Sequence, residues 1–426
     1  MHDRVAGSGI RGKGKGKRRV RKRKSEHDAV EEASRERARI RPEGDTRRPR
    51  VLFISRKHPP SVGGMERLSH ELVTHMRKRL PCSAITWGHS QAYLPFFLPV
   101  ALSRAAFSLA TGSYDMIHIG DALLSPLGLF LKRLSGRPVA VNLHGLDLTF
   151  PNRLYQRAIR AALPGLDLFI CISRQARDIA VGMGIPSEKT RIIPCGIVVE
   201  GRKTPPDRRI AREELTRVLG RELRGKALIL TVGRLVKRKG VLRFIGEILP
   251  RVADRFPDLF YLVVGEGEED RAIRQEIARG KLEDHVVLIG RVSEEALEMA
   301  YRASDIFVMP NIRVEGDMEG FGIVAIEAAL RGLPVVASAV EGICDAVIDG
   351  QNGILVHSED PGAFAAAVMD LLGDEGRRER IGRQGRDFTE REFGWERIAQ
   401  QYHENFSSCS GIPAPDYRII GEAGSI

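Results

Sequence analysis

The sequence predicts an α/β protein of two doubly wound domains, each a parallel sheet covered by helices, that face each other across a central cleft. Three observations lead to this prediction. The chain has 426 residues, which is more than one hydrophobic core usually supports. Short, almost wholly apolar runs alternate with helical stretches from Val51 onward. A charged stretch with a Pro-Pro pair interrupts this alternation once, at residues 201–225, and the alternation then resumes.

The first domain is assigned to residues 51–200. Its strand-like runs are apolar at nearly every position, which is typical of a parallel sheet with helices on both faces. The six runs expected to form strands are VLFIS at 51–55, SAITW at 83–87, MIHIG at 116–120, PVAVNLHG at 138–145, LFICIS at 168–173 and RIIPCG at 191–196.

Residues 201–225 are interpreted as a linker, and residues 226–384 as a second domain with the same architecture. Ligands of open parallel sheets bind beyond the carboxyl ends of the strands, so we expect the functional residues in the loops that follow the strands. The six further strand-like runs are ALILTVGR at 227–234, YLVVGEG at 261–267, VVLIGRV at 286–292, DIFVMPN at 305–311, PVVASAV at 334–340 and GILVH at 353–357.

The basic character of the chain is concentrated in its first 50 residues. They hold 18 Lys and Arg against 8 Asp and Glu, whereas the other 376 residues hold 49 against 47. The composition of residues 1–50 predicts a disordered tail. The tail is either an electrostatic anchor to anionic lipid or nucleic acid, or merely a solvated extension. Because the rest of the chain is nearly neutral, a nucleic-acid partner is not expected.

The sequence favours a cytoplasmic protein. It shows no signal peptide, and its five scattered cysteines suggest neither a disulfide framework nor a zinc site. The most apolar stretch, Tyr93 to Leu109, is interrupted by Pro95, Pro99 and Arg104 and is shorter than the ~20 residues that span a bilayer. It is interpreted as a buried or half-buried helix, with membrane contact at the inner face of the plasma membrane as the alternative.

Two loops contain candidate phosphate-binding groups. HPPSVGGMER follows the first strand, and its Gly63 and Gly64 let backbone amides approach a phosphate at a helix N-terminus, although such a pair is also common in plain turns. TVGRLVKRKG, at 231–240, places Arg234 and Lys239 in one loop. A guanidinium fork and a mobile ammonium suit a diphosphate, and the alternative is a solvated basic turn.

The stretch GDMEGFGIVAIEAALRGLPVVAS, at 316–338, is the most informative. Glu319 falls in its loop, and Glu327 lies within an apolar helix, where a carboxylate is costly to bury unless it is paired or binds a polar ligand such as vicinal hydroxyls. The amides of Phe321 and Gly322 at the start of that helix are placed to receive anionic oxygen. His144, in NLHGLD, lies beyond another strand end.

Together these residues resemble the retaining glycosyltransferases of family 4, which have the GT-B fold of two Rossmann-like domains. The resemblance covers nearly all of residues 51–406 and depends on the Glu-x7-Glu of Glu319 and Glu327, on GRLVKRKG and on PPSVGGMER. It implies an acceptor-side first domain, a nucleotide-sugar donor domain, a helix at 385–408 that crosses back to the first domain, and a flexible tail at 409–426. One departure is VEGICDAV, where Glu341 precedes Gly342 in place of the family's frequent Gly-Gly pair.

The resemblance also implies a role for each site residue. Arg234 and Lys239 would clamp the donor diphosphate, Glu327 would bind the ribose hydroxyls, and Glu319 would contact the donor sugar. His144 would lie beside the transferred sugar. The remaining donor contacts would come from the backbone and from the nucleobase cradle, namely Gly63, Gly64, Phe321, Gly322, Ile323, Arg291 and Val292.

The predicted function is therefore the transfer of a hexose from a UDP- or GDP-sugar to a lipid-linked, polysaccharide or other glycan acceptor, with retention of anomeric configuration. No Asp-x-Asp metal motif is present, and a metal-independent reaction with no cofactor is expected. The alternatives are a UDP-sugar epimerase-like enzyme on the same fold and a nucleic-acid-binding protein that acts through its basic tail.

Overall fold

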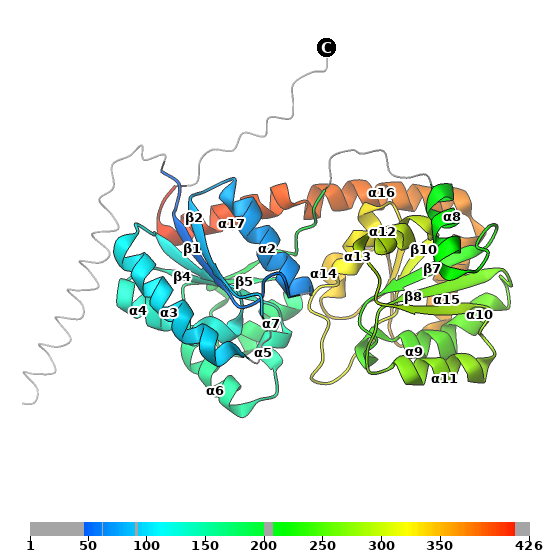
Figure 1. The fold of residues 1–426 in the computed structure, drawn as a ribbon, viewed down its shortest axis with the longest axis horizontal. Helices are drawn as coiled ribbons and strands as arrows, with labels where there is room; N and C mark the ends of the chain where they lie inside the picture. The colour runs from blue at the N-terminus through cyan, green and yellow to red at the C-terminus, as the bar shows by residue number, and fades with distance from the viewer. Residues whose placement is uncertain (1–46, 62, 90–92, 200–207, 414–426) are drawn as a thin grey trace, which may run out of the picture. The chain divides into compact units, whose positions relative to one another are not determined.

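The computed structural model describes residues 47–61, 63–89, 93–199 and 208–413. It contains two six-stranded sheets with flanking helices, which confirms the predicted α/β fold class (Figure 1). The tail predicted at 1–50 lies outside the described residues up to position 46, and so do residues 200–207 of the linker region and 414–426 of the C-terminal tail. Arg50 lies within the described part, where its backbone N–H donates to Asp115 at 2.9 Å.

The first sheet has the strand order β2-β1-β3-β4-β5-β6, and all of its neighbouring strands are parallel. Its strands are β1 (Val51–Ser55), β2 (Cys82–Thr86), β3 (Met116–Ile119), β4 (Val139–Leu143), β5 (Leu168–Cys171) and β6 (Thr190–Ile192). The helices that connect them are α2 (Gly64–Arg77), α3 (Leu94–Thr111), α4 (Ser125–Ser135), α5 (Leu146–Thr149), α6 (Arg153–Ala162) and α7 (Arg174–Gly182), with short 3-10 turns at Ala122–Leu124, Leu163–Gly165 and Ser187–Lys189.

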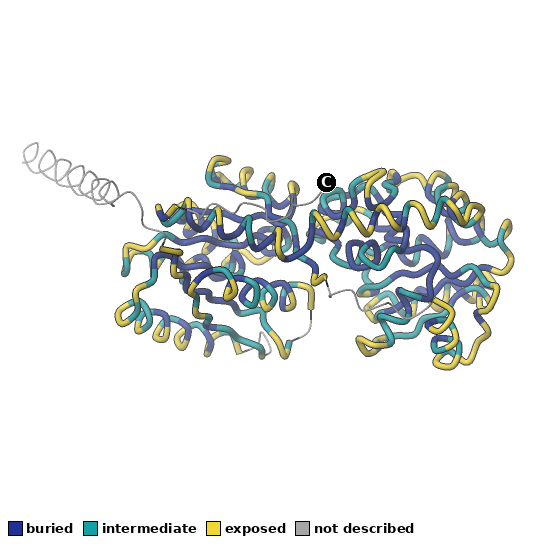
Figure 2. The backbone as a smooth tube through the Cα atoms, turned by 90° about the horizontal axis from the view of Figure 1, so that it is seen from above, coloured by how far each residue is buried: buried dark blue, intermediate teal, exposed yellow. Residues whose placement is uncertain are grey.

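Alternate residues of β1 enter two separate cores. Val51 and Phe53 pack with the apolar side of α2, whereas Leu52 and Ile54 pack with α3, α4, α6 and α7. Burial on both faces explains why every residue of this strand is apolar except Ser55. Figure 2 shows the resulting pattern, in which buried backbone runs inside a more exposed helical layer.

The second sheet has the order β12-β11-β10-β7-β8-β9 and is likewise parallel. Its strands are β7 (Ala227–Val232), β8 (Leu259–Val264), β9 (Val286–Gly290), β10 (Ile306–Met309), β11 (Val335–Ser338) and β12 (Ile354–Val356). Its helices are α8 (Arg208–Leu219), α9 (Val241–Arg243), α10 (Leu249–Ala253), α11 (Asp270–Gly280), α12 (Glu294–Ala303), α13 (Ile323–Leu330), α14 (Ile343–Ala346) and α15 (Pro361–Gly373), with a 3-10 turn at Lys237–Lys239 and a π segment at Phe244–Ile248.

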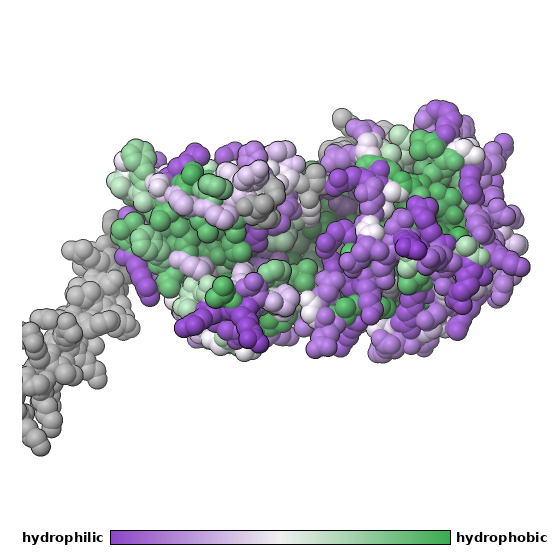
Figure 3. All heavy atoms as spheres, turned by 60° about the horizontal axis from the view of Figure 1, so that its bottom comes forward, coloured by the Kyte–Doolittle hydropathy of each residue, from purple (hydrophilic) through white to green (hydrophobic). Residues whose placement is uncertain are grey.

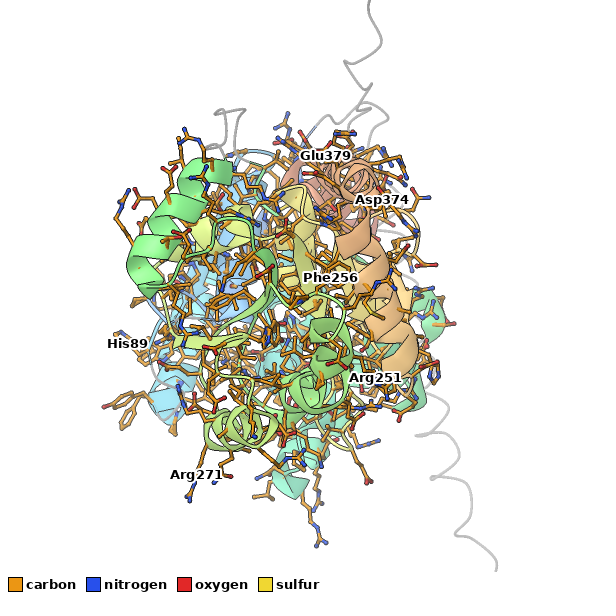
Figure 4. The ribbon with its side chains drawn as sticks, turned by 90° about the vertical axis from the view of Figure 1, so that its right-hand side faces the viewer. His89, Arg251, Phe256, Arg271, Asp374 and Glu379 are labelled. Atoms are coloured by element: carbon orange, nitrogen blue, oxygen red, sulfur yellow. The ribbon has the colours of Figure 1, made fainter. Side chains whose placement is uncertain are left out.

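These helices form two layers on the second sheet. One core joins α8, α12 and α13 to the sheet, and the other joins α9, α10, α11 and α15. Figure 4 views this part of the chain from its end, where Arg271 on α11 points outward from the helical layer. The outer surface of that layer therefore carries charged side chains.

Two long helices end the described chain. α16 (Glu375–Phe393) contacts α13, and α17 (Trp395–Ser410) packs against α2 and the first sheet. Tyr402 donates a hydrogen bond to Asn142 on β4 at 3.1 Å, and Phe406 is fully buried beside Phe53. α17 thus completes the core of the first sheet.

Candidate active site

The loops that follow β7, β8 and β9 are joined by backbone hydrogen bonds. Gly233 donates to Val264 at 2.9 Å, Leu235 donates to Glu266 at 2.9 Å, and Gly265 donates to Gly290 at 2.9 Å. Gly265 has φ +141, and an added Cβ would lie 1.8 Å from the carbonyl oxygen of Gly233, so only glycine permits this approach. The carboxyl ends of three neighbouring strands therefore form one surface, as a doubly wound sheet requires of its ligand site.

Lys239 and Glu319 form the centre of the candidate site. Lys239 Nζ lies 2.5 Å from Glu319 Oε2, and both side chains are largely buried. Asn311, which follows β10, donates from Nδ2 to the same oxygen at 3.1 Å, and Arg238 Nε lies 3.5 Å from it. Arg238 is further fixed by Asp317, whose oxygens accept at 2.7 and 2.8 Å. Loops far apart in sequence thus surround one carboxylate with two cations and one amide donor.

These donors determine the ionisation of Glu319. Burial opposes the charged form, but Lys239, Arg238 and Asn311 together outweigh it and hold the pKa of Glu319 below its ordinary value. The carboxylate is therefore ionised at neutral pH. An ionised carboxylate accepts hydrogen bonds, as the hydroxyls of a sugar require.

Glu341 and Gly342, where the sequence departs from the family's pattern, both form hydrogen bonds with the backbone of Glu319. Glu341, at φ 48, accepts the backbone N–H of Glu319 at 2.5 Å, and Gly342 donates to the Glu319 carbonyl at 3.2 Å. Burial, together with the negative charge of Glu319, raises the pKa of Glu341. The glutamate at this position thus holds the loop through its side chain.

Glu327 has two partners in the structure. Its Oε1 lies 2.7 Å from Arg67 Nη1, and its Oε2 accepts from the Tyr301 hydroxyl at 3.0 Å. The sequence indicates that a carboxylate in this apolar helix needs polar partners, and these two side chains supply them. Arg67 is about half exposed, so one of the two partners can exchange with solvent or ligand.

The start of α13 contributes backbone groups. Gly322 is its N-cap in the left-handed region with φ 95, Phe321 is buried, and Ile323 begins the helix. The first N–H groups of a helix have no carbonyl partner within it and carry partial positive charge. Glu319, two residues upstream of Phe321, thus lies beside a group of available amide donors.

His144 lies at the carboxyl end of β4. Its Nε2 is 2.9 Å from the carbonyl oxygen of Gly120, and its Nδ1 is buried without a hydrogen-bond partner. Asp147 accepts the His144 backbone N–H at 2.9 Å, which fixes the turn, and burial raises the pKa of this Asp147 carboxyl. An added Cβ on Gly320 would lie 2.7 Å from the His144 carbonyl oxygen, so the loop with Glu319 passes directly beside this turn.

Gly63 and Gly64 begin α2 and are exposed. Glu66 folds back over Gly63 and lies 3.0 Å from Lys57 Nζ, so a negative charge already occupies this helix start. A Cβ on Gly64 would lie 3.4 Å from the Ile323 side chain. The Gly-Gly turn is therefore adjacent to the start of α13.

Three of the predicted residues are not joined to this cluster by direct contacts. Arg234 is exposed and has no side-chain ion pair or hydrogen bond within the described residues, which leaves its guanidinium available. Arg291 is exposed and its backbone N–H donates to Glu266 at 3.3 Å, whereas Val292 packs partly into the core of the second sheet. They nevertheless follow β7 and β9, two strands whose loops are joined as described above.

Sequence reasoning did not single out Arg67, Arg238, Tyr301 or Asn311. Arg238 could have been found from the sequence, because it adjoins Lys239 in the same basic run. Arg67 and Tyr301 carry no local signal, because their relation to Glu327 arises only from tertiary packing.

Two family profiles match the chain. One, described as Glycosyl transferases group 1, matches residues 214–388, and the other, Glycosyltransferase Family 4, matches residues 62–200.

Curated relatives match across most of their length. The chain is 26% identical to the GDP-mannose-dependent alpha-(1-6)-phosphatidylinositol monomannoside mannosyltransferase of Mycolicibacterium smegmatis over 81% of this chain and 95% of that protein. It is 32% identical to the D-inositol 3-phosphate glycosyltransferase of Xylanimonas cellulosilytica over 70% of this chain and 72% of that protein.

Solved structures share the fold. Anabaena HepE in complex with UDP aligns with a TM-score of 0.68 at 22% identity, covering 84% of this chain and all of that one. The sucrose-phosphate synthase of Thermosynechococcus elongatus aligns with a TM-score of 0.67 at 23% identity, covering 85% of this chain and 99% of that one.

Proposed function

This chain belongs to the family 4 glycosyltransferases with the GT-B fold, and on that premise we propose that it transfers a hexose from a UDP- or GDP-sugar to a lipid-linked or other glycan acceptor with retention of configuration. The chain is a glycosyltransferase, which argues against the epimerase-like and nucleic-acid-binding alternatives.

The main support for this proposal is the Lys239–Glu319 ion pair. A largely buried ammonium and carboxylate 2.5 Å apart offer both groups that a nucleotide sugar needs, a cation for its diphosphate and an acceptor for its sugar hydroxyls. An arriving diphosphate competes with Glu319 for Lys239. Asn311 and Arg238 keep Glu319 ionised and oriented during that exchange.

Charge development on the leaving group requires donors that are already in place. As the anomeric bond breaks, the nucleoside diphosphate gains negative charge, and preorganised donors stabilise that charge more strongly than water does. Lys239, the available guanidinium of Arg234 and the amides at the start of α13 supply such donors. We propose that these groups suffice and that the reaction uses no metal and no cofactor.

Retention is proposed to follow from attack on the same face of the sugar, with the departing phosphate accepting the acceptor's proton. Glu319 is not assigned as a nucleophile, because its carboxylate is held by Lys239 and Asn311. His144 would border the transferred sugar, since its turn lies against the loop that carries Glu319.

The names of two curated relatives guide the choice of acceptor. One is a phosphatidylinositol mannoside mannosyltransferase that depends on GDP-mannose, and the other is an inositol phosphate glycosyltransferase. We propose a lipid-linked acceptor, and with it action in the cytoplasm at the inner face of the membrane.

Turnover with a panel of UDP-, GDP- and ADP-sugars tests the proposal. Each donor is incubated with inositol phosphate, phosphatidylinositol vesicles or no acceptor, and release of nucleoside diphosphate is measured. We expect one UDP- or GDP-sugar to be consumed in an acceptor-dependent manner and the product to keep the donor's anomeric configuration by NMR. An inverted product would refute the retaining mechanism, and chelator-sensitive turnover would refute metal independence.

A further inference from the structure

Large hydrophobic residues are exposed mainly on one part of the chain. Of the thirteen that are exposed among the described residues, eight lie between positions 93 and 154, including all five exposed aromatic residues. The eight are Tyr93, Phe96, Val100, Phe107, Phe130, Leu134, Phe150 and Leu154. Exposed apolar residues that gather in one patch mark an interaction site.

One side of α3 exposes several large apolar residues. Phe96, Val100 and Phe107 are spaced by four and seven residues, so they lie on one side of the helix, with Phe96 and Phe107 about 70% exposed. The opposite side carries Phe97 and Ala101, which are fully buried against the first sheet. Among the described helices, α3 is the one that is long and apolar enough to span a membrane, yet only 17% of it is buried. Its inner side belongs to the core, so α3 lies along the surface.

α4 and α6 expose further apolar residues. α3 packs on α4, and α4 packs on α6. α4 exposes Phe130 and Leu134, one turn apart, and α6 exposes Leu154. In Figure 3, hydrophobic side chains gather on the part of the chain that contains these helices, whereas hydrophilic ones predominate on the part that contains the second sheet. We call the surface of α3, α4 and α6 the apolar face.

The exposed charges of residues 93–164, the segment that contains the apolar face, have one sign. Residues 93–164 contain seven Lys and Arg and three Asp, and all three aspartates, Asp115, Asp121 and Asp147, are buried. Lys132 is paired with Asp167 at 2.6 Å. The other six are exposed arginines with no side-chain partner in the described part of the chain, namely Arg104, Arg133, Arg137, Arg153, Arg157 and Arg160.

We propose that the apolar face binds the surface of a bilayer containing anionic phospholipid. Aromatic and aliphatic side chains enter the boundary between headgroups and acyl chains, and the arginines contact lipid phosphates. A second copy of the chain fits this face less well, because a symmetric contact would oppose arginine with arginine and offer no exposed carboxylate. This inference does not rest on the proposed reaction, since binding to vesicles needs neither donor nor acceptor.

Vesicle co-sedimentation of the full-length chain tests the proposal. Phosphatidylcholine vesicles are compared with vesicles that also contain phosphatidylglycerol, at low salt and at a salt concentration that screens the basic residues of positions 1–50. The apolar variant combines Phe96→Ser, Phe107→Ser and Phe130→Ser, and its control combines Val181→Ser, Ile210→Ser and Val218→Ser, three exposed residues elsewhere. The charge variant combines Arg104→Gln, Arg153→Gln and Arg157→Gln, and its control combines Arg255→Gln, Arg271→Gln and Arg386→Gln.

The expected results distinguish membrane binding by the apolar face from membrane binding by residues 1–50. The apolar variant should lose at least tenfold in vesicle affinity, roughly what removing several buried aromatic side chains predicts, and it should lose it at both salt concentrations. The charge variant should lose roughly fivefold for each arginine on anionic vesicles only. Both controls should bind like the wild type. Equal binding by the apolar variant and the wild type would assign any membrane affinity to residues 1–50 and overturn the proposal.

A second experiment measures directly whether α3 side chains insert into the bilayer. Phe107→Trp places a fluorophore on the exposed side of α3, and lipids brominated on their acyl chains should quench its emission beyond that of the native Trp87 and Trp395. Unquenched emission would overturn the proposal. So would a concentration-dependent dimer by light scattering that the apolar variant abolishes, if vesicle binding is absent.

Discussion

Glu319 and Lys239 depend on each other for charge compensation. Each is the other's nearest counter-charge, and both lie mostly out of solvent, where an unpaired charge is expensive. The sequence predicts that both residues matter. It does not predict their pairing, because they are 80 positions apart and meet only when the loops after β7 and β10 close on each other.

Replacing Lys239 should weaken donor binding specifically. Lys239→Ala removes the cation assigned to the diphosphate, so we expect roughly 10- to 100-fold weaker nucleotide-sugar affinity, the range for a lost charge-assisted hydrogen bond. Isothermal titration calorimetry measures this affinity, with the nucleotide sugar that the wild type turns over as the ligand. Lys237→Ala is the matched control, because Lys237 lies in the same loop but is exposed and outside the Glu319 cluster. Similar losses in both variants would contradict the assignment.

His118 gives a pH dependence at the residue scale. It is fully buried on β3, where burial above all lowers its pKa to about 4, aided by His144, while its contact with Asn142 acts in the opposite direction. Below pH 6.5, His118 binds a proton in the unfolded chain but stays neutral in the folded chain. Stability contributed by neutral His118 is therefore present at neutral pH and is lost as the pH falls from 6.5 toward 4.

The measurement compares denaturant unfolding of the wild type and His118→Gln at pH 7 and pH 4.5. Between these values the wild type should lose about 2 kcal/mol more than the variant, as linkage predicts for a shift of this size. If the two stabilities fall in parallel, the buried histidine is not the cause.

At the scale of elements, the twelve strands were predictable and the contacts between their loops were not. Strands that are buried on both faces consist of nearly continuous apolar runs, and such runs can be recognised in a single sequence. Ends shift slightly, since β8 starts at Leu259, two residues before the predicted run. The apolar composition of α3 predicted a helix. It could not show that its aromatic residues face outward, because composition is the same for either orientation.

The Glu341–Gly342 turn tests how an element supports the site. An added Cβ on Gly342 would lie 2.0 Å from the Gly320 carbonyl oxygen, a backbone atom that cannot move aside. Gly342→Ala should therefore displace the Glu319 loop, reduce stability by about 1–3 kcal/mol and weaken donor binding. Gly373→Ala is the control, because nothing lies within 4 Å of its added Cβ. Unchanged donor affinity in Gly342→Ala would show that the turn does not position Glu319.

At the scale of the whole molecule, α17 connects the end of the described chain to its first sheet. Phe406 contacts the rings of Phe53, His118 and Tyr402 at centroid distances of 6.0, 5.6 and 5.7 Å. The final helix and its return to the first domain were expected only from the resemblance, because sequence periodicity does not identify what a helix covers.

Phe406→Ala should destabilise β1 and β3, which lie more than 280 positions away in the chain. The cavity is expected to cost about 3–5 kcal/mol and to speed hydrogen exchange in β1 and β3. Ser408→Ala, two residues further along the same helix and exposed, is the control. Unchanged exchange in β1 and β3 would contradict the packing of α17 on this sheet.

The central claim is that the loops around Glu319 and Lys239 bind a nucleotide sugar for transfer. Its most direct test is acceptor-dependent release of nucleoside diphosphate from UDP- and GDP-sugars by the wild type and by Glu319→Gln, which keeps the shape of the side chain but removes its charge. We predict that the wild type turns over one of these donors and that the variant loses most of that rate while remaining folded. Equal turnover by the two proteins would contradict the claim.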